Sequence, residues 1–219
     1  MKAIIFDFDG VIIDSEPLRY ATYKKLFLEE YNITIPEDFK KVIGKKQEDN
    51  LKHFLQLFEL QGDINDLVNK RKLLLKSTFA DSKNIIPIKG IQNILIKLHQ
   101  RGIKLAIATS STISYVQPIL EYLNISQYFS SIVTGPEVIN GKPAPDIFKL
   151  AAQKLNLHSE DCLVIEDSIA GIKAAKSAKM SCYAITTYLD AASFEQENYT
   201  FADYTEPELI NKLESIFTP

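Results

Sequence analysis

The chain alternates between short apolar runs and longer segments in which apolar residues recur every three or four positions. The first apolar run covers residues 2–8, and its β-branched and aromatic residues are typical of a buried strand. From residue 15 to residue 82 the spacing is helical, most clearly over residues 17–31, 49–60 and 66–79. This part of the sequence has no convincing strand pattern, so we expect it to be all-helical.

After residue 85 the pattern changes to a regular alternation of strands and helices. Runs typical of strands cover residues 104–109, 130–135, 162–167 and 181–186, and helical patterns cover residues 90–102, 113–123, 145–157, 168–180 and 207–217. Such alternation is typical of parallel β-α-β units. We therefore predict an α/β fold with a Rossmann-like parallel sheet core flanked by helices, formed by residues 1–14 and 83–219. An all-α cap domain, residues 15–82, is inserted after the first strand.

Composition and charge narrow the range of partners. The 25 basic and 28 acidic residues give a net charge of -3, which argues against nucleic acid as the main partner. No apolar run approaches membrane-spanning length, and no signal-peptide pattern precedes the first strand. Cys162 and Cys182 lie in apolar, strand-like surroundings, which is typical of reduced thiols in a cytosolic protein. We therefore expect a cytoplasmic protein that binds neither nucleic acid nor membranes, and we expect a monomer.

Polar residues follow the predicted strands where each of them ends. In a parallel sheet the carboxyl ends of the strands meet at one edge, and ligands bind in the crevice there. We therefore expect residues from four separate segments to converge at this edge. They are Asp7 and Asp9, then Thr109, Ser110 and Ser111, then Lys142, and finally Glu166 and Asp167.

These residue types together favour phosphoryl transfer. Clustered carboxylates repel one another unless a cation lies between them, and Mg²⁺ prefers a few carboxylates together with phosphate oxygen and water. Lys142 and the Thr109 hydroxyl could neutralise and hydrogen-bond phosphoryl oxygens. One of the two aspartates Asp7 and Asp9 could attack phosphorus while the other protonates the leaving oxygen. Taken singly, each residue could equally be a helix cap or a surface charge.

Four segments resemble, in order, the motifs of the haloacid dehalogenase-like superfamily. They are DFDGVIID (7–14), ATSS (108–111), GKPAPD (141–146) and VIEDSIAGIKAA (164–175). The helical segment that follows the first motif resembles the small cap domain of that superfamily. The resemblance implies that Asp7 is the nucleophile, that Asp9 is the general acid and base, that Thr109 binds phosphate, and that Lys142 steadies the nucleophile and the phosphate. It also implies that Mg²⁺ is held by Asp7, Glu166, Asp167 and Asp9, the last through its backbone carbonyl.

Within the superfamily the chain is similar to the branch of β-phosphoglucomutase and the sugar-phosphate phosphatases. That mutase carries a histidine where this chain has Arg19, and a cap arginine in the stretch that contains Gln47. Loss of the arginine removes a bidentate clamp for a second phosphate. We therefore expect a Mg²⁺-dependent phosphatase for a small phosphorylated metabolite, such as a sugar phosphate, with a phosphosugar mutase as the alternative. The candidate substrate-binding residues are Ser110, Ser111, Glu16, Arg19, Lys45 and Gln47.

A second alternative, of another class, is a phospho-acceptor signalling module. Receiver domains also combine an acidic pair, an aspartate, a threonine and a lysine. They are shorter than this chain, lack a helical insertion, and carry the acceptor on a middle strand. The candidate nucleophile here lies on the first strand, so we rank this alternative last.

Overall fold

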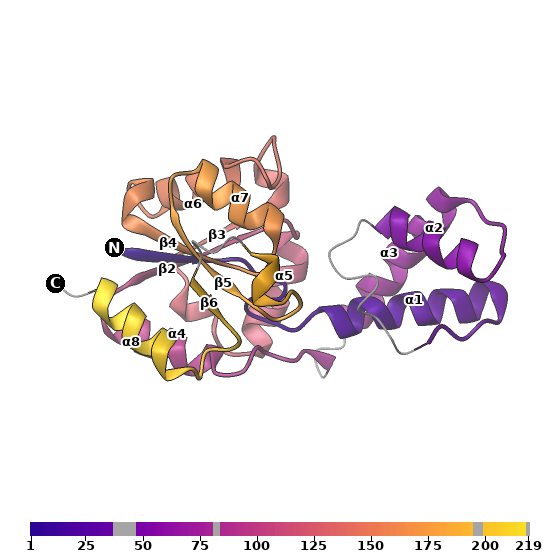
Figure 1. The fold of residues 1–219 in the computed structure, drawn as a ribbon, viewed down its shortest axis with the longest axis horizontal. Helices are drawn as coiled ribbons and strands as arrows, with labels where there is room; N and C mark the ends of the chain where they lie inside the picture. Colours follow the sequence, from indigo (N-terminus) through magenta and orange to yellow (C-terminus); the bar gives the residue numbers. More distant parts are fainter. Residues whose placement is uncertain (37–46, 81–83, 195–198, 218–219) are drawn as a thin grey trace. The chain divides into compact units, whose positions relative to one another are not determined.

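The computed structural model describes residues 1–36, 47–80, 84–194 and 199–217. The chain divides into two compact units, one formed by residues 1–14 and 86–219 and the other by residues 15–85 (Figure 1). The predicted domain boundary between residues 82 and 83 involves residues that lie outside the described part of the chain. Each unit is described below by itself.

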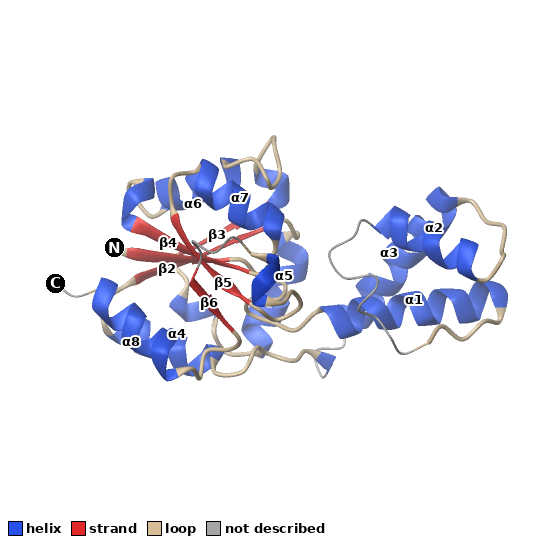
Figure 2. Cartoon of the chain, in the orientation of Figure 1, coloured by secondary structure: helices blue, strands red, loops and turns tan. Residues whose placement is uncertain are grey.

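The first unit is built on a parallel sheet with the strand order β3-β2-β1-β4-β5-β6 (Figure 2). The strands are β1 (Ala3–Phe6), β2 (Lys104–Thr109), β3 (Ser131–Thr134), β4 (Cys162–Glu166), β5 (Ser181–Ile185) and β6 (Tyr199–Phe201). The predicted α/β fold with a parallel sheet is confirmed. The sequence did not reveal β6, because a strand of three residues is too short to show a period of two.

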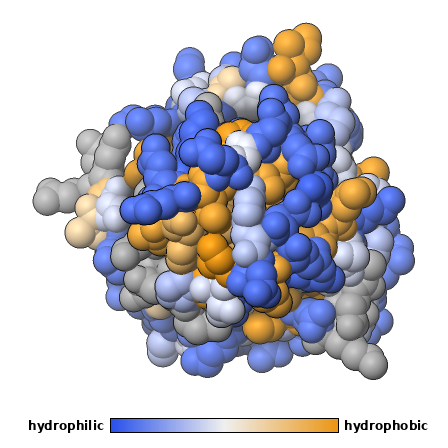
Figure 3. All heavy atoms as spheres, turned by 90° about the vertical axis from the view of Figure 1, so that its right-hand side faces the viewer, coloured by the Kyte–Doolittle hydropathy of each residue, from blue (hydrophilic) through white to orange (hydrophobic). Residues whose placement is uncertain are grey.

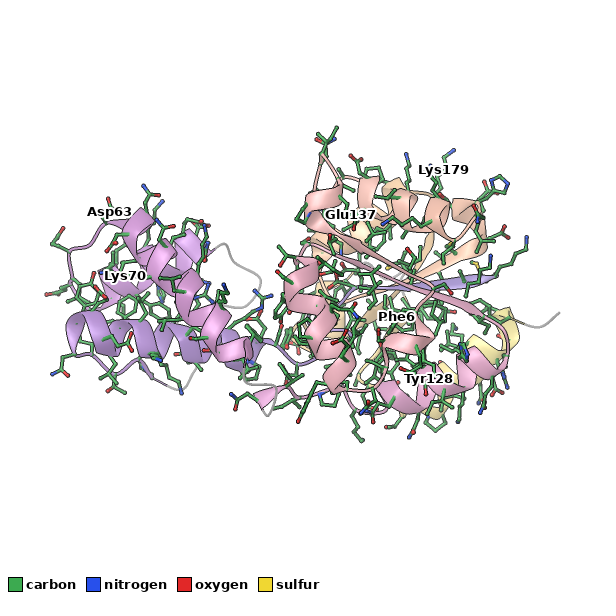
Figure 4. All side chains as sticks on the ribbon, turned by 180° about the vertical axis from the view of Figure 1, so that it is seen from behind. Phe6, Asp63, Lys70, Tyr128, Glu137 and Lys179 are labelled. Carbon is green, nitrogen blue, oxygen red and sulfur yellow. The ribbon has the colours of Figure 1, made fainter. Side chains whose placement is uncertain are left out.

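Helices cover both faces of this sheet. They are α4 (Ile91–Gln100), α5 (Ile113–Tyr122), α6 (Asp146–Lys154), α7 (Ile169–Ser177) and α8 (Pro207–Ile216). Helices α6 and α7 lie on one face, and α4 and α8 lie on the other (Figure 1). Phe148 of α6 packs with Ile5 of β1 in the core of the first face. On β1, Phe6 (labelled in Figure 4) is fully buried. Its ring contacts that of Phe129 edge to face, with centroids 6.1 Å apart.

The strand order creates a switch point beside β1. From β1 the chain proceeds outward through β2 and β3, and then returns to place β4 on the other side of β1. In open parallel sheets, ligands bind outside the carboxyl ends of the strands at such a point. A ligand-binding site is therefore expected at the carboxyl ends of β1, β2 and β4.

The second unit is helical. It contains α1 (Glu16–Tyr31), α2 (Gln47–Leu57) and α3 (Ile64–Ala80). Its own core is rich in aromatic residues, and Phe54 contacts the rings of both Tyr23 and Phe27 at centroid distances of 5.5 Å. At the surface Lys70 of α3 pairs with Glu30 of α1 (Figure 4 labels Lys70). Since these helices bury a common apolar core, the unit is stabilised by its own packing.

The length of the described helices and the positions of the exposed apolar side chains bear on whether a segment could span a membrane. Within the described ranges, none of the helices combines the length and the apolar character that a membrane-spanning segment requires. The face seen in Figure 3 mixes hydrophilic with apolar residues. The helical unit exposes several single leucines, namely Leu28, Leu57 and Leu73. Scattered exposed apolar side chains are normal for a folded protein.

Candidate active site

The first aspartate of the chain lies directly after the central strand. The Asp7 N–H donates to the carbonyl of Ile165 at 2.9 Å, so the pairing of β1 with β4 extends over this residue and fixes it. Asp7 is only 8% exposed, and its Oδ1 accepts a hydrogen bond from Lys142 Nζ at 2.6 Å. Burial raises the pKa of the Asp7 carboxyl to about 7, with Lys142 acting in the opposite direction. The carboxyl is therefore shielded from water and sits beside a cation.

Lys142 connects the ends of three neighbouring strands. Its Nζ donates to Asp7 Oδ1 at 2.6 Å, to Glu166 Oε1 at 2.6 Å and to the carbonyl of Ala108 at 3.2 Å. These three bonds use the full donor capacity of an ammonium group. Burial by itself would lower the pKa of Lys142, but the Asp7 and Glu166 carboxylates raise it above its ordinary value. Lys142 therefore stays positively charged within the site.

Both oxygens of the Glu166 carboxylate are fixed. Oε1 faces Lys142, and Oε2 accepts the N–H groups of Asp167 at 2.9 Å and Ser168 at 2.8 Å together with the Ser168 hydroxyl at 2.9 Å. The Ser168 hydroxyl also accepts the Gly171 N–H at 3.0 Å and so caps α7. A Cβ atom on Gly171 would lie 1.8 Å from Glu166 Oε1. The start of α7 is therefore in close contact with the Glu166 carboxylate, and the contact leaves no room for a side chain at position 171.

Three carboxylates meet at this point. One oxygen of each of Asp7, Glu166 and Asp167 lies within 4.8 Å of the others. Burial raises the pKa of Asp167 well above its usual range, and the negative charges of Glu166 and Asp7 add to the effect. Gly10 packs against this carboxylate with φ of +78°, and a Cβ there would lie 2.1 Å from Asp167 Oδ2. Hard oxygen ligands that repel one another fit a divalent cation such as Mg²⁺.

The Asp9 carboxylate has a different set of partners. Ser111 Oγ donates to Asp9 Oδ2 at 2.8 Å, and the Tyr115 hydroxyl donates to Asp9 Oδ1 at 2.9 Å. Thr109 is buried, and its Oγ1 accepts the Ser111 N–H at 3.1 Å. Ser110 lies between them in sequence and is exposed. The structure therefore brings Asp9 and the hydroxyl-rich turn after β2 together.

The candidate residues of the helical unit are placed as follows. Glu16 and Arg19 lie in the first two turns of α1, where Arg19 Nε is 3.8 Å from Glu16 Oε1 and donates to Ser15 Oγ at 3.3 Å. Gln47 is the first residue of α2. Lys45 lies outside the residues that the structure describes. Glu16 and Arg19 are therefore neighbours.

Arg71 of α3 holds two of these candidates in place. It is only 4% exposed, and its guanidinium carbon lies 3.7 Å from the ring centroid of Tyr23. Nη1 donates to Gln47 Oε1 and Nη2 donates to the carbonyl of Arg19, both at 3.1 Å. One buried arginine thus links α1, α2 and α3.

Three of these residues were not predicted from the sequence, namely Arg71, Gly171 and Tyr115. Arg71 stands in the stretch NKRKLLLK, where an arginine among lysines is typical of a solvated face. Gly171 lies within the fourth motif, so the sequence did contain a signal that could have identified it. Tyr115 occupies an ordinary position in a helical pattern, and only the folded chain reveals its contact.

Comparison with known proteins gives the same family that the motifs suggested. Residues 4–185 match the family model described as haloacid dehalogenase-like hydrolase. A phosphorylated carbohydrates phosphatase of Thermotoga maritima is 30% identical, over 99% of this chain and 100% of that protein. A β-phosphoglucomutase of Bacillus subtilis is 34% identical, over 82% of this chain and 81% of that protein. A solved structure from Thermotoga maritima, 30% identical, covers 99% of this chain and 100% of its own with a TM-score of 0.81.

Proposed function

The chain belongs to the haloacid dehalogenase-like hydrolase family, and on that premise we propose a function for it. It is a Mg²⁺-dependent phosphatase that hydrolyses a small phosphorylated metabolite, a sugar phosphate, through an aspartyl-phosphate intermediate. The observation that carries this proposal is Lys142, whose ammonium group lies 2.6 Å from both the Asp7 and the Glu166 carboxylates. A buried lysine shared by two carboxylates gives positive charge at the position where a phosphoryl group would meet Asp7.

The first chemical step is transfer of the phosphoryl group to the enzyme. Asp7 attacks phosphorus with a carboxylate oxygen, and the bond between phosphorus and the sugar oxygen breaks. Asp9 gives its proton to that leaving oxygen, so the product departs as an alcohol. The positive charge of Lys142 and the Thr109 hydroxyl stabilise the negative charge of the phosphoryl oxygens.

The second step is hydrolysis of the aspartyl-phosphate. A water molecule attacks phosphorus, its proton goes to the Asp9 carboxylate, and the bond between phosphorus and the Asp7 oxygen breaks. Inorganic phosphate leaves, and Asp9 regains the proton that it lost in the first step. The cycle therefore consumes one water molecule and restores both aspartates.

The acidic group of the site suits Mg²⁺. Asp7, Glu166 and Asp167 would hold the ion together with the backbone carbonyl of Asp9, and their oxygens belong to the ligand type that Mg²⁺ prefers. A bound ion supplies charge neutralisation for the phosphoryl oxygens. The raised pKa of Asp167 supports this assignment, because an ion would relieve the same repulsion that raises it.

Residues 15–85 act as the cap in this proposal. A cap that covers the strand ends would exclude water from the site and contribute substrate contacts. Glu16, Arg19, Lys45 and Gln47 are the candidate selectors on the cap, and Ser110 and Ser111 are those on the core. The linkage of Arg19 and Gln47 through the buried Arg71 supports a fixed geometry for two of them.

The second candidate is a phosphosugar mutase. It is favoured by the 34% identity to a β-phosphoglucomutase. A mutase must hold a doubly phosphorylated sugar, whereas Gln47 offers a neutral amide that is already engaged with Arg71. Product analysis separates the two: free phosphate in proportion to substrate consumed means hydrolysis, and a moved phosphate without release means a mutase.

A panel of phosphorylated sugars and other small metabolites with Mg²⁺ tests the proposal. We expect release of phosphate by the wild type, loss of activity with EDTA, and recovery when Mg²⁺ is restored. Asp7→Asn should lose turnover by at least about a thousandfold, because the attacking group is gone. Asp190→Asn is a matched control, since Asp190 is exposed and stands in the loop after β5. Turnover retained by Asp7→Asn, or unaffected by EDTA, would contradict the proposal.

A further inference from the structure

A tyrosine of α5 reaches the second aspartate of the first motif. The Tyr115 hydroxyl lies 2.9 Å from Asp9 Oδ1, and Ser111 Oγ lies 2.8 Å from Asp9 Oδ2. Each oxygen of this carboxylate therefore has its own hydroxyl donor. The two donors come from the turn after β2 and from the first turn of α5, far from Asp9 in the sequence.

The tyrosine is itself firmly held. Its ring packs edge to face on Phe8, with a centroid distance of 5.8 Å and an interplanar angle of 84°, and Phe8 is fully buried. Its backbone N–H donates to the carbonyl of Thr112 at 3.0 Å at the start of the helix. A phenol has two side-chain torsions, so a ring fixed in this way places its hydroxyl rigidly.

We infer that Tyr115 is a positioning residue for the acid and base Asp9, an inference that rests on the proposed function. The last torsion of an aspartate is broad, so a carboxyl held at one oxygen can still rotate. Donors on both oxygens fix its plane. A general acid acts only within hydrogen-bond reach of the atom that it protonates. Tyr115 thus keeps Asp9 aimed at the leaving oxygen.

The proton transfer is compatible with these contacts. When Asp9 carries a proton, that proton takes a lone pair that the two hydroxyl donors leave free, because each carboxyl oxygen has two lone pairs. As the bond between phosphorus and the leaving oxygen breaks, the proton moves from Asp9 to that oxygen. Both hydroxyls donate to the resulting carboxylate, as in the structure.

The test compares two phosphate esters that differ in their need for an acid. The leaving group of a sugar phosphate is a strongly basic alkoxide unless it is protonated. The leaving group of p-nitrophenyl phosphate is a weakly basic phenolate, which needs little help from an acid. The constant to measure is kcat/KM, which includes only the steps up to departure of the leaving group. The later attack of water, in which Asp9 acts as a base for both esters, does not enter it.

For Tyr115→Phe we expect kcat/KM for the sugar phosphate to fall about tenfold, the effect of one hydrogen bond to a charged group. For p-nitrophenyl phosphate we expect a change of less than about twofold, because that ester hardly uses the acid. Tyr122→Phe is the matched control, since Tyr122 lies on the same helix with an exposed side chain. It should change neither constant. In an Asp9→Asn background, adding Tyr115→Phe should have no further effect.

Two results would overturn the inference. An equal loss of kcat/KM with both esters would mean that Tyr115 only supports the local structure, and an undiminished constant with the sugar phosphate would mean that its hydroxyl is not needed. Thermal unfolding of each variant separates either outcome from a folding defect. A wild type that hydrolyses neither ester is a different result, because it contradicts the proposed function itself.

Discussion

Replacing Gly171 by alanine should destabilise the protein, against the usual trend for a helix. Gly171 is the third residue of α7, and in a helix alanine is normally about 1 kcal/mol better than glycine. A Cβ atom at this position would lie 1.8 Å from Glu166 Oε1 and 2.5 Å from Oε2. No rotation of a methyl group relieves such an overlap, so the Glu166 carboxylate has to leave its place.

The magnitude follows from the contacts that Glu166 would give up. Oε1 pairs with Lys142 at 2.6 Å, and Oε2 accepts two N–H groups and the Ser168 hydroxyl. A hydrogen bond to a charged group contributes about 1.5–3 kcal/mol, so the loss of two of them costs about 3–6 kcal/mol. The gain in helix propensity offsets about 1 kcal/mol of this. We expect a net loss of about 2–5 kcal/mol in the free energy of unfolding.

A double-mutant cycle in urea, with EDTA present, measures the effect. Because the chain has no tryptophan, far-ultraviolet circular dichroism is the suitable probe. In a Glu166→Ala background the obstructing carboxylate is absent, so Gly171→Ala should stabilise by up to about 1 kcal/mol. The sign of the effect should therefore reverse between the two backgrounds. Equal destabilisation in both backgrounds, or a stabilised single variant, would refute the argument.

Two further predictions concern the same edge of the sheet. Mg²⁺ at about a hundred times its dissociation constant should stabilise the wild type by about 2.7 kcal/mol, which corresponds to a rise of about 5–10 °C in Tm. Asp167→Asn should remove most of this shift, because it removes one of three carboxylates. Calorimetry with and without Mg²⁺ measures it, and an equal shift in both proteins would argue against Asp167 as a ligand. Ser168→Ala should lower the free energy of unfolding by about 1–2 kcal/mol, because Ser168 caps α7 and also donates to Glu166. Ser177→Ala, at the exposed end of α7, should change it by less than about 0.5 kcal/mol. Urea unfolding compares the two serine variants, and similar losses would show that the cap contributes little.

Hydrophobic periodicity was sufficient to predict most of the fold. The runs at residues 104–109 and 162–167 predict strands, because β-branched and other apolar residues fill both faces of a buried parallel strand. They form β2 and β4. The strand β6 was missed, since its three residues at the edge of the sheet carry too little pattern. A proline inside a helical pattern commonly ends or kinks the helix, yet α5 contains Pro118 and continues to Tyr122.

The site could be predicted as a set of residues but not as a set of contacts. Asp7 and Glu166 were found because each one ends an apolar strand, and parallel strands bring such ends together. Their shared partner Lys142 comes from a loop, where its position followed from a motif rather than from periodicity. The bond between Tyr115 and Asp9 had no counterpart in the sequence, because a tyrosine in an amphipathic helix is typical of packing.

With the exception of β6, the order of apolar and polar residues alone determined which segments are strands, which are helices, and which side chains stand at the strand ends. That information is local, because burial on one or both faces imposes a period on each segment. Only the tertiary structure decided which oxygen meets which donor: Lys142 between Asp7 and Glu166, and Tyr115 against Asp9. Contacts between residues more than a hundred positions apart depend on how helices pack on the sheet to within a fraction of an ångström, and no local period encodes that distance.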